Sequence, residues 1–563
     1  MQRLKNKFKK VTATHTGRNI ILSILIFLIA VITAGLWYWN THKKAILKNE
    51  MEASIREKSN GLYKIKYDSL DMDEIEGYLS ISNMNLFYDS TRYLELSKQG
   101  KEPSILLSIR IPEITVSGVK TPQALINDEI VGRKLEIKNP VIDIIYTNSG
   151  KDSSSIVPPK EIYEQILGNL DLIKADTVLI SGAQITTSSL HSKKTSVQIQ
   201  DVTITLVDVK VDSSSNADTT RILFAKESSI TCSKLFWTSA DKLYNYFVDS
   251  ISINSVSRNL HVKSFRAVPT LNEEAFVKAL PTQADRYDYA ISNIEIQNIN
   301  LQQLFEERII ADKVLIPSAS LKIYRDLAIP RDKRNRVGSY PHQLMQTIPI
   351  SFRVEKIMIT NGFIEYKERH NISRLAGKIQ YYNVNATISN FTNDKKAIAA
   401  NNVMTVDMNT MFLNRSPLHV SGRFYLLHPK GRFDLKGSFG AMDATLLNPI
   451  IERTGLTHIK SGMINGAEFS VQGQDYTADG TVKMMYDDLK VAALEKNKGS
   501  SQLDKKGFSS FIVNIIIKNS NPKKNQDVRV AQVHLDRNTN SSFFNFSWKT
   551  ILKGLTETVG LKE

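Results

Sequence analysis

The stretch IMITNGFIEYKE, Ile357–Glu368, has an apolar run, the dipeptide Asn-Gly and a second apolar run. Asn361 and Gly362 both tolerate positive φ, so the stretch predicts a β-hairpin with a two-residue turn. Nearly the same phrase recurs as LEIKNPVIDIIY from Leu135, as VLISGAQITTSS from Val178 and as VLIPSASLKIY from Val314. The chain therefore repeats one strand-forming unit.

Each phrase can be folded about its turn, which places residues equidistant from the turn opposite each other on one face. Seven of the eight resulting pairs are wholly apolar; the pairs are Leu135/Ile144, Ile137/Ile142, Val178/Thr187, Ile180/Ile185, Val314/Ile323, Ile316/Leu321, Ile357/Tyr366 and Ile359/Ile364. The opposite face is largely polar. Pro140 cannot adopt the positive φ of a type I′ turn, so that copy is expected to turn differently.

The N-terminus has the pattern of a membrane anchor. Residues 1–18 carry six lysines and arginines and no acid, and Ile20–Trp39 is a run of twenty residues without a charge. Such a run is long enough to span about 30 Å of hydrocarbon, and Trp37 and Trp39 suit the aromatic belt at the membrane interface. The run ends in bulky aromatics, unlike a cleavable signal peptide. We expect a basic cytoplasmic stub over 1–18 and an uncleaved transmembrane anchor over 19–40, with most of the chain exported.

Composition excludes several classes of protein. The single cysteine, Cys232, rules out an intramolecular disulfide and a cysteine-based metal cluster. The net charge of +16 is scattered outside the N-terminal stub, and no RNP motif, zinc finger or basic helix accompanies it. We therefore expect no nucleic acid partner, and the basic balance fits a protein near anionic lipid headgroups.

The spacing of the phrases indicates a duplication. Their turns begin at residues 139, 182, 318 and 361, so the second pair follows the first by 179 residues. Residues 60–238 and 239–415 are taken as two copies of one β module, each with a short proline-initiated helix between its paired phrases. Those helices are expected in PPKEIYEQILGNLDLI from Pro158 and in YPHQLMQTI from Tyr340.

The tail is also β-patterned. Residues 416–540 hold long predicted strands interrupted by one helix, DATLLNPIIERTG. Residues 541–563 predict an amphipathic helix whose apolar stripe is Trp548, Ile551, Leu552, Leu555 and Val559. This helix would either dock on a membrane or cap the open end of the last sheet.

The anchor, the recurring I-x-I-x-N-G-x-I-x-Y phrase and the tail motif LNPIIERTG…IKSGMINGAEFSVQGQ together resemble the AsmA-like envelope proteins of the Bacteroidetes type. The resemblance covers most of the chain but rests on strand patterns and transfers no functional residue. It implies an inner-membrane helix, a periplasmic β-sheet curled into a groove, and a role in passing phospholipids toward the outer membrane or in supporting its assembly.

The fold class expected is mainly β with few short helices. The apolar faces of the strands need a cover. Two sheets would cover each other as sandwiches, which periodicity alone slightly favours, or one elongated, curled antiparallel sheet would form a groove filled by acyl chains. The resemblance favours the groove.

No catalytic signature stands out, since the ten histidines are scattered and no H-E-x-x-H, G-x-S-x-G, P-loop or dinucleotide motif is present. The acidic cluster from Asp68 to Glu76 lacks the glycine and the distal glutamate of a calcium loop. The basic loop from Arg331 to Arg336 is expected to solvate the surface rather than bind headgroups. We expect neither an enzyme nor a cofactor or metal, and an exported hydrolase is the least favoured hypothesis.

The favoured hypothesis is a single-pass protein of a bacterial inner membrane whose periplasmic bulk binds phospholipid or another acyl lipid. The alternative is a non-enzymatic assembly scaffold that binds an envelope protein through strand edges. The candidate lipid-contacting residues are Ile137, Ile142, Ile180, Ile185, Ile316, Leu321, Ile350, Phe352, Val354, Ile359 and Ile364, and the anchor is represented by Ile20, Trp37 and Trp39.

Overall fold

The structure is a computed structural model that describes residues 55–561 with gaps at 57–58, 74, 120–128, 148–171, 191–194, 213, 216–217, 495–511 and 516. The predicted stub and anchor, including Ile20, Trp37 and Trp39, lie outside the described residues, as does most of the helix expected from Pro158. Among the residues described, no helix is both long and apolar enough to cross a membrane.

The described residues form one mixed, mostly antiparallel sheet of 24 strands. The strands are β1 Tyr63–Lys66, β2 Ser69–Asp73, β3 Tyr78–Tyr88, β4 Ile105–Ser117, β5 Glu129–Lys138, β6 Val141–Tyr146, β7 Leu172–Ser189, β8 Thr195–Val211, β9 Ala225–Thr238, β10 Tyr244–Asn254, β11 Asn259–Pro269, β12 Arg286–Gln297, β13 Arg308–Ile316, β14 Ser318–Asp326, β15 Ser351–Arg369, β16 Ala376–Thr392, β17 Val403–Phe412, β18 Ser416–Tyr425, β19 Phe433–Phe439, β20 Met442–Asp443, β21 Thr457–Gly473, β22 Thr477–Leu494, β23 Ile512–Ile515 and β24 Val530–Asp536. The expectation of a mainly β chain is confirmed, and the sandwich alternative does not apply to the part of the chain described.

Helices are few and short. They are α4 Ser90–Lys98, α7 Glu273–Lys278, α8 Leu301–Phe305, α9 Pro341–Met345, α10 Lys395–Ala400, the 3₁₀ helix η1 Ala444–Leu447, α11 Asn448–Thr454 and α12 Phe543–Thr558. The predicted helices from Tyr340, from Asp443 and at the C-terminus are confirmed as α9, as η1 with α11, and as α12. Pro341 opens α9 at its first turn.

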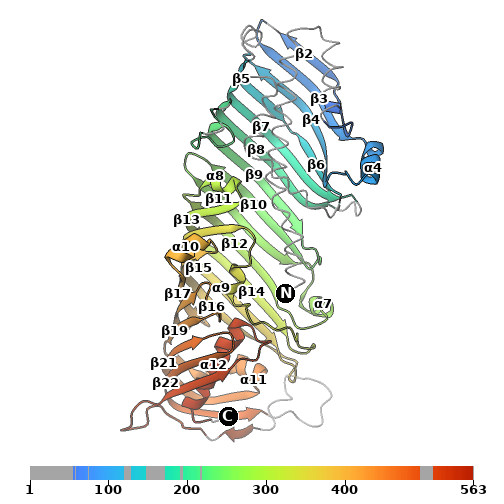
Figure 1. Ribbon diagram of the computed structural model, residues 1–563. Helices are drawn as coiled ribbons and strands as arrows, with labels where there is room; N and C mark the ends of the chain where they lie inside the picture. Colours follow the sequence, from blue (N-terminus) through green and yellow to red (C-terminus); the bar gives the residue numbers. More distant parts are fainter. Residues whose placement is uncertain are drawn as a thin grey trace.

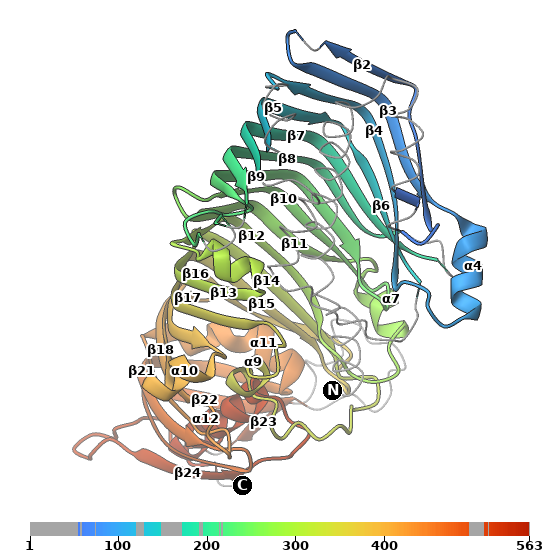
Figure 2. The same cartoon turned by 45° about the horizontal axis from the view of Figure 1, so that its top comes forward.

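The strands follow one another across the sheet in the order of the chain, so the sheet is an elongated, twisted and curved ladder (Figures 1 and 2). At some positions in this ladder two short strands lie end to end and together pair with one long strand, as β5 and β6 do and as β13 and β14 do. At about 4.8 Å per row, about nineteen rows would extend roughly 90 Å. Helices α9, α11 and α12 gather at the C-terminal end of this ladder.

The hairpin prediction for the repeated phrase is wrong. Residues 351–369 form the single strand β15, which runs through Asn361 and Gly362 with a β-bulge. The phrase from Val178 likewise lies within β7, and the other two phrases are strands interrupted at Pro140 and at Pro317. Asn361 does have positive φ, 52°, but one left-handed residue inside a strand makes a bulge rather than a reversal.

A bulge and a two-residue hairpin leave the same pattern in a sequence. In a strand without a bulge, residues five positions apart face opposite sides, whereas one extra residue returns them to the same side. Ile359 and Ile364 therefore share a face along one strand, as they would across a hairpin. The residues paired in the sequence therefore share one face, but they lie apart along a single strand and do not face each other across a turn.

Within each pair of phrases the two turns begin 43 residues apart, and the strand pairing explains this spacing. β5 and β6 pair in parallel with β7, and β13 and β14 pair in parallel with β15. Ile137 lies beside Ile180, and Ile316 lies beside Ile359. In each pair of phrases, a strand interrupted at a proline therefore lies parallel to a continuous strand, with the interruption beside the bulge of its partner.

The order of elements recurs along the chain. β5 begins at Glu129 and β13 at Arg308, while β7 begins at Leu172 and β15 at Ser351, which repeats the 179-residue shift seen in the sequence. The sheet is continuous where the proposed modules meet, because β9 pairs with β10 and β17 pairs with β18. The proposed boundaries near 238 and 415 therefore coincide with no break in the hydrogen-bonded ladder.

Candidate apolar binding face

A line of left-handed residues crosses the strands and sets the shape of the sheet. We call it the kink line; its residues with positive φ are Asn83, Asn139, Gly182, Asp201, Ser250, Asn293 and Asn361. Hydrogen bonds join neighbouring strands at this line: Asn139 N–H donates to Ser181 O at 2.7 Å, and Ser233 Oγ, opposite Ser250, donates to Asp201 Oδ2 at 3.1 Å. The pairings of β7 and β15 shift register at this line, and such bulges bend strands and increase their twist.

On one side of the kink line, a row of aliphatic side chains runs from strand to strand. We call it the aliphatic row; successive members are direct register partners, and they are Leu70, Ile81, Ile114, Ile137, Ile180, Ile204, Ile230, Ile253, Leu260, Ile296, Val314, Ile357, Ile388 and Val406. Every member is Ile, Leu or Val. The row contains no aromatic, polar or charged residue from β2 to β17.

On the other side of the kink line, the middle of the sheet carries a row in which aromatic side chains, four of them with a polar end, alternate with aliphatic ones. We call this the aromatic row; its successive register partners are Trp237, Tyr246, Ala267, Tyr289, Leu321, Ile364, Tyr381 and Phe412. Trp237 stacks on Tyr246 with ring centroids 4.8 Å apart, and Phe265 lies 5.5 Å from Tyr289.

Burial along this face changes from one end of the ladder to the other. Ile81, Ile114 and Ile137 are at most 2% exposed and belong to one packed cluster. From β8 to β17 the aliphatic row is half-buried. Beyond β17 its register positions continue into Leu435 and Val471, which pack with residues of α9, α10 and α12. Among the described residues, the middle of the face is therefore less buried than the N-terminal end, although Ile253, Leu260 and Ile296 pack there against the cluster that contains Leu301 of α8.

The covered end is held by a buried cluster of polar and aromatic groups. Arg537 has a fully buried side chain and donates to Asp475 O at 3.0 Å and to Arg336 O at 2.9 Å. Its guanidinium lies 4.4 Å from the ring centroid of Tyr340, the N-cap of α9. These contacts fix the segment between β14 and β15 to the C-terminal end of the sheet.

His342 of α9 lies in the same cluster. It is 1% exposed, and neither ring nitrogen has a hydrogen-bond partner among the described residues. Its ring centroid is 5.3 Å from that of Phe424. Burial is the main cause that lowers the pKa of His342 from 6.5 to about 4; nearby His428 lowers it further and Asp475 opposes the shift.

An ion pair lies beside the aromatic row, near the start of β12. Arg325 donates to both carboxylate oxygens of Asp285, at 2.7 and 2.8 Å, and Tyr287 Oη donates to the same carboxylate at 3.1 Å. Burial and the neighbouring tyrosines raise the pKa of Tyr289 to about 12, and burial raises the pKa of Tyr246. The hydroxyls of this row are therefore neutral hydrogen-bond donors at physiological pH.

Eight of the predicted contact residues flank the kink line, four in the first repeat and four in the second. Ile137, Ile142, Ile180 and Ile185 pack in one cluster, while Ile316, Leu321, Ile359 and Ile364 are half-buried.

The other three predicted contact residues lie at the start of β15. Phe352 is stacked on Phe391 at 5.0 Å within the cluster that contains α9, Val354 is buried, and Ile350 precedes the strand. The structure therefore does not bring these three to the accessible stretch.

Sequence reasoning missed the aromatic row. Its signal is present in the alternating tyrosines of YNYF at Tyr244 and RYDY at Arg286. These stretches lie outside the four repeated phrases from which the contact residues were predicted, so the prediction did not include them.

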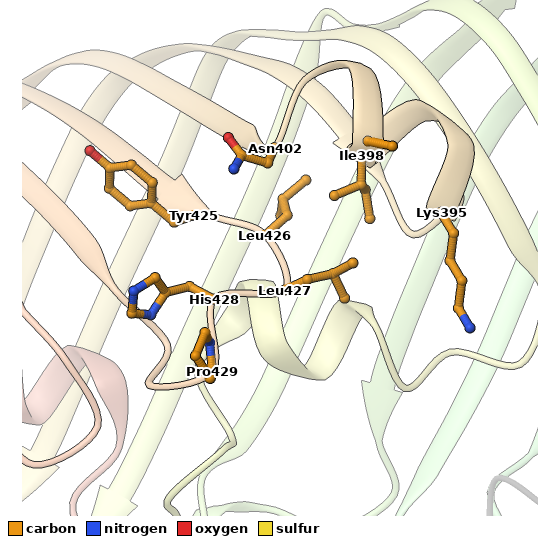
Figure 3. A pocket seen from close by; sticks show the side chains of 9 residues that line it. Lys395, Ile398, Asn402, Tyr425, Leu426, Leu427, His428 and Pro429 are labelled. Carbon is orange, nitrogen blue, oxygen red and sulfur yellow. The ribbon is translucent and has the colours of Figure 1, made fainter.

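A separate shallow pocket of about 400 Å³ lies between α10 and the loop after β18 (Figure 3). Lys395 and His428 lie on either side of Leu427, and no carboxylate is among the lining residues. The pocket thus offers no carboxylate to pair with Lys395 or His428. Within the described part of the chain, no group of three His, Cys, Asp or Glu side chains is placed to hold a metal ion.

In comparisons with known proteins, no protein-family model matches the chain, and no curated protein is significantly similar to it.

Proposed function

We propose that this chain is a non-enzymatic, membrane-anchored protein of the AsmA-like type that binds phospholipid acyl chains along its apolar face and guides them between envelope membranes. The observation that carries the proposal is the aliphatic row, which continues across the sheet without a polar interruption and is half-buried in its middle. The anchor predicted over 19–40 would hold the protein at the inner membrane of a bacterium, with the sheet in the periplasm.

The energetics favour an apolar occupant. A monomeric soluble protein rarely exposes a long continuous apolar surface without a binding role. Each methylene group that an acyl chain buries contributes about 0.8 kcal/mol, so an acyl chain that reaches side chains of the aliphatic row such as Ile230 or Ile357 would be held by many small, equivalent contacts. Equivalent contacts from strand to strand allow sliding, because no single position holds the ligand much more tightly than the next.

Transfer along such a face needs no chemical step. Movement would be diffusion, and its direction would be set by the membranes or proteins at the two ends. A role in outer-membrane biogenesis follows from this proposal if the distal end delivers lipid to the outer membrane.

A test is to purify the full chain in detergent, extract it with organic solvent and count the lipids by mass spectrometry. We expect several phospholipids per wild-type chain and a loss of most of them when Ile359 and Ile364 are both replaced by Asp. The matched control is Met358→Asp with Thr360→Asp, since both side chains are exposed and alternate with Ile359 along β15. Equal lipid content in the two folded variants would contradict the proposal.

The edges of the sheet support the alternative of an assembly scaffold. Among the described residues, β2 pairs only with β3 and β24 pairs only with β22, so each terminal strand leaves one side open for strand addition. A folded, lipid-free protein in the experiment above would favour this alternative.

A further inference from the structure

The two sides of the kink line differ in chemistry. From β9 to β16 the aliphatic row holds only Ile, Leu and Val. The aromatic row and the register positions next to it hold Trp237, Tyr246 and Tyr289 together with Tyr244, Tyr287 and Tyr366. An occupant that was apolar throughout would gain nothing from hydroxyls on one side only.

Three donors on the aromatic row are available to a ligand. The indole N–H of Trp237 and the hydroxyls of Tyr246 and Tyr289 have no hydrogen-bond partner in the part of the chain that the structure describes. All three side chains are half-buried, and Ala267 between Tyr246 and Tyr289 leaves a small side chain at the centre. Tyrosine and tryptophan are the residues that favour the boundary between hydrocarbon and polar headgroups.

The separation of the two rows suits a lipid. On β15 the aliphatic row is at Ile357 and the aromatic row at Ile364, seven residues apart and about 23 Å along the strand. The bulge at Asn361 shortens the direct path. One leaflet of a bilayer core is about 15 Å thick, so an acyl chain that starts near the aromatic row reaches toward the aliphatic row.

We propose that phospholipids lie parallel to the strands of β9–β12, with ester and phosphate oxygens at Trp237, Tyr246 and Tyr289 and acyl chains directed over the kink line to the aliphatic row. This assignment rests on the proposed function and adds to it one fixed orientation of the lipid. Headgroups would then follow one long edge of the sheet, the edge on which α4 and α7 lie (Figure 2).

The orientation can be measured by tryptophan quenching in the full chain. Trp37, Trp39 and Trp548 are replaced by Phe, which leaves Trp237 as the only tryptophan. The protein in detergent is titrated with phosphatidylcholine dibrominated either at acyl carbons 6 and 7 or at carbons 11 and 12. A second reporter carries Ile357→Trp together with Trp237→Phe. We expect the 6,7-dibromo lipid to quench Trp237 at least twofold more strongly, and the reverse order for the reporter at 357.

Each outcome decides between the two claims. Quenching of Trp237 that is equal for both lipids, or stronger with the 11,12-dibromo lipid, would overturn the orientation and leave lipid binding standing. No quenching of either reporter by either lipid would overturn lipid binding itself. If the variant Ile357→Trp does not fold, the reporter Trp237 alone still distinguishes these outcomes.

The hydroxyls provide an independent readout. Tyr246→Phe with Tyr289→Phe keeps both rings and removes two donors, so the apparent affinity for phospholipid should fall about tenfold. The control is Tyr476→Phe, whose side chain is 58% exposed and lies outside both rows. An unchanged affinity in the double variant would contradict the assignment of these hydroxyls.

Discussion

Asn361 holds its backbone at a φ of 52°, a conformation that costs an ordinary L-residue about 1–2 kcal/mol and that asparagine adopts more readily. Its N–H lies 3.3 Å from Asn385 Oδ1 on the neighbouring strand. The bulge at this position returns Ile359 and Ile364 to one face, so a backbone preference of a single residue determines which side chains line the apolar face.

Replacement of Asn361 by Val should therefore lower the free energy of unfolding by about 1–2 kcal/mol, because a β-branched residue is poorly tolerated at positive φ. Asn361→Gly should be close to neutral, and Thr360→Val, at an exposed neighbouring position, is the control for β-branching. Urea denaturation followed by circular dichroism measures all three. A Val variant as stable as the Gly variant would show that the bulge does not depend on this residue.

His342 makes stability depend on pH. Its pKa in the folded protein, about 4, lies below the ordinary value of 6.5, so the unfolded chain binds the proton more readily between these values. The stabilisation is complete above about pH 6.5 and is lost as the pH falls toward 4. Between pH 6.5 and pH 5 the loss is about 2 kcal/mol, at about 1.4 kcal/mol per pH unit.

The variant His342→Phe should remove this pH dependence, since a phenyl ring fits beside Phe424 and Tyr340 and binds no proton. Urea midpoints of wild type and variant at pH 7.5 and pH 5 provide the comparison. Equal midpoint shifts in the two proteins would mean that other groups cause the acid sensitivity.

At the scale of elements, α12 shows why an amphipathic pattern can mislead. The predicted stripe includes Trp548 and Leu552, yet these side chains are 51% and 40% exposed. Ile551, Leu555 and Val559 of the stripe do pack against the core clusters, and the helix also buries Phe546, Thr550 and Gly554. The reason is closeness to the sheet, because a Cβ on Gly554 would lie 2.3 Å from Val482 Cγ2.

Phe546→Ala should cost about 3–5 kcal/mol of stability, as expected for removal of a fully buried aromatic side chain. Trp548→Ala on the exposed side should cost less than about 1 kcal/mol. Chemical denaturation of the two variants distinguishes the faces. A larger loss of stability for Trp548→Ala than for Phe546→Ala would support the apolar stripe predicted from the sequence.

Much of the element inventory could be predicted from the sequence. The tail strands, α9, η1 with α11 and α12 were expected, because proline positions, alternation and caps are local signals. That the chain continues straight through Asn361 was not predictable, since a bulge and a hairpin place the same residues on one face. The aromatic row depends on register between β9, β10 and β12, and register is fixed by long-range pairing that no local pattern contains.

At the scale of the whole molecule, one sheet replaces the packed core of a globular domain. Its ends differ from its middle: the N-terminal strands hold a tightly packed cluster, and the C-terminal strands are covered by α9, α10 and α12. Between them, β8–β17 expose half-buried Ile, Leu and Val in a continuous row. We therefore propose that lipid binds at the middle of the ladder.

The most direct test of this claim is site-specific photo-crosslinking of the full chain in cells whose phospholipids are labelled with ³²P. A benzophenone amino acid replaces Ile253 or Ile357 in the aliphatic row, and Ser252 or Met358 as neighbouring residues of the opposite face. The account predicts strong label on the chain with the crosslinker at 253 or 357 and little at 252 or 358. Equal labelling at all four positions, or none in a folded protein, would contradict it.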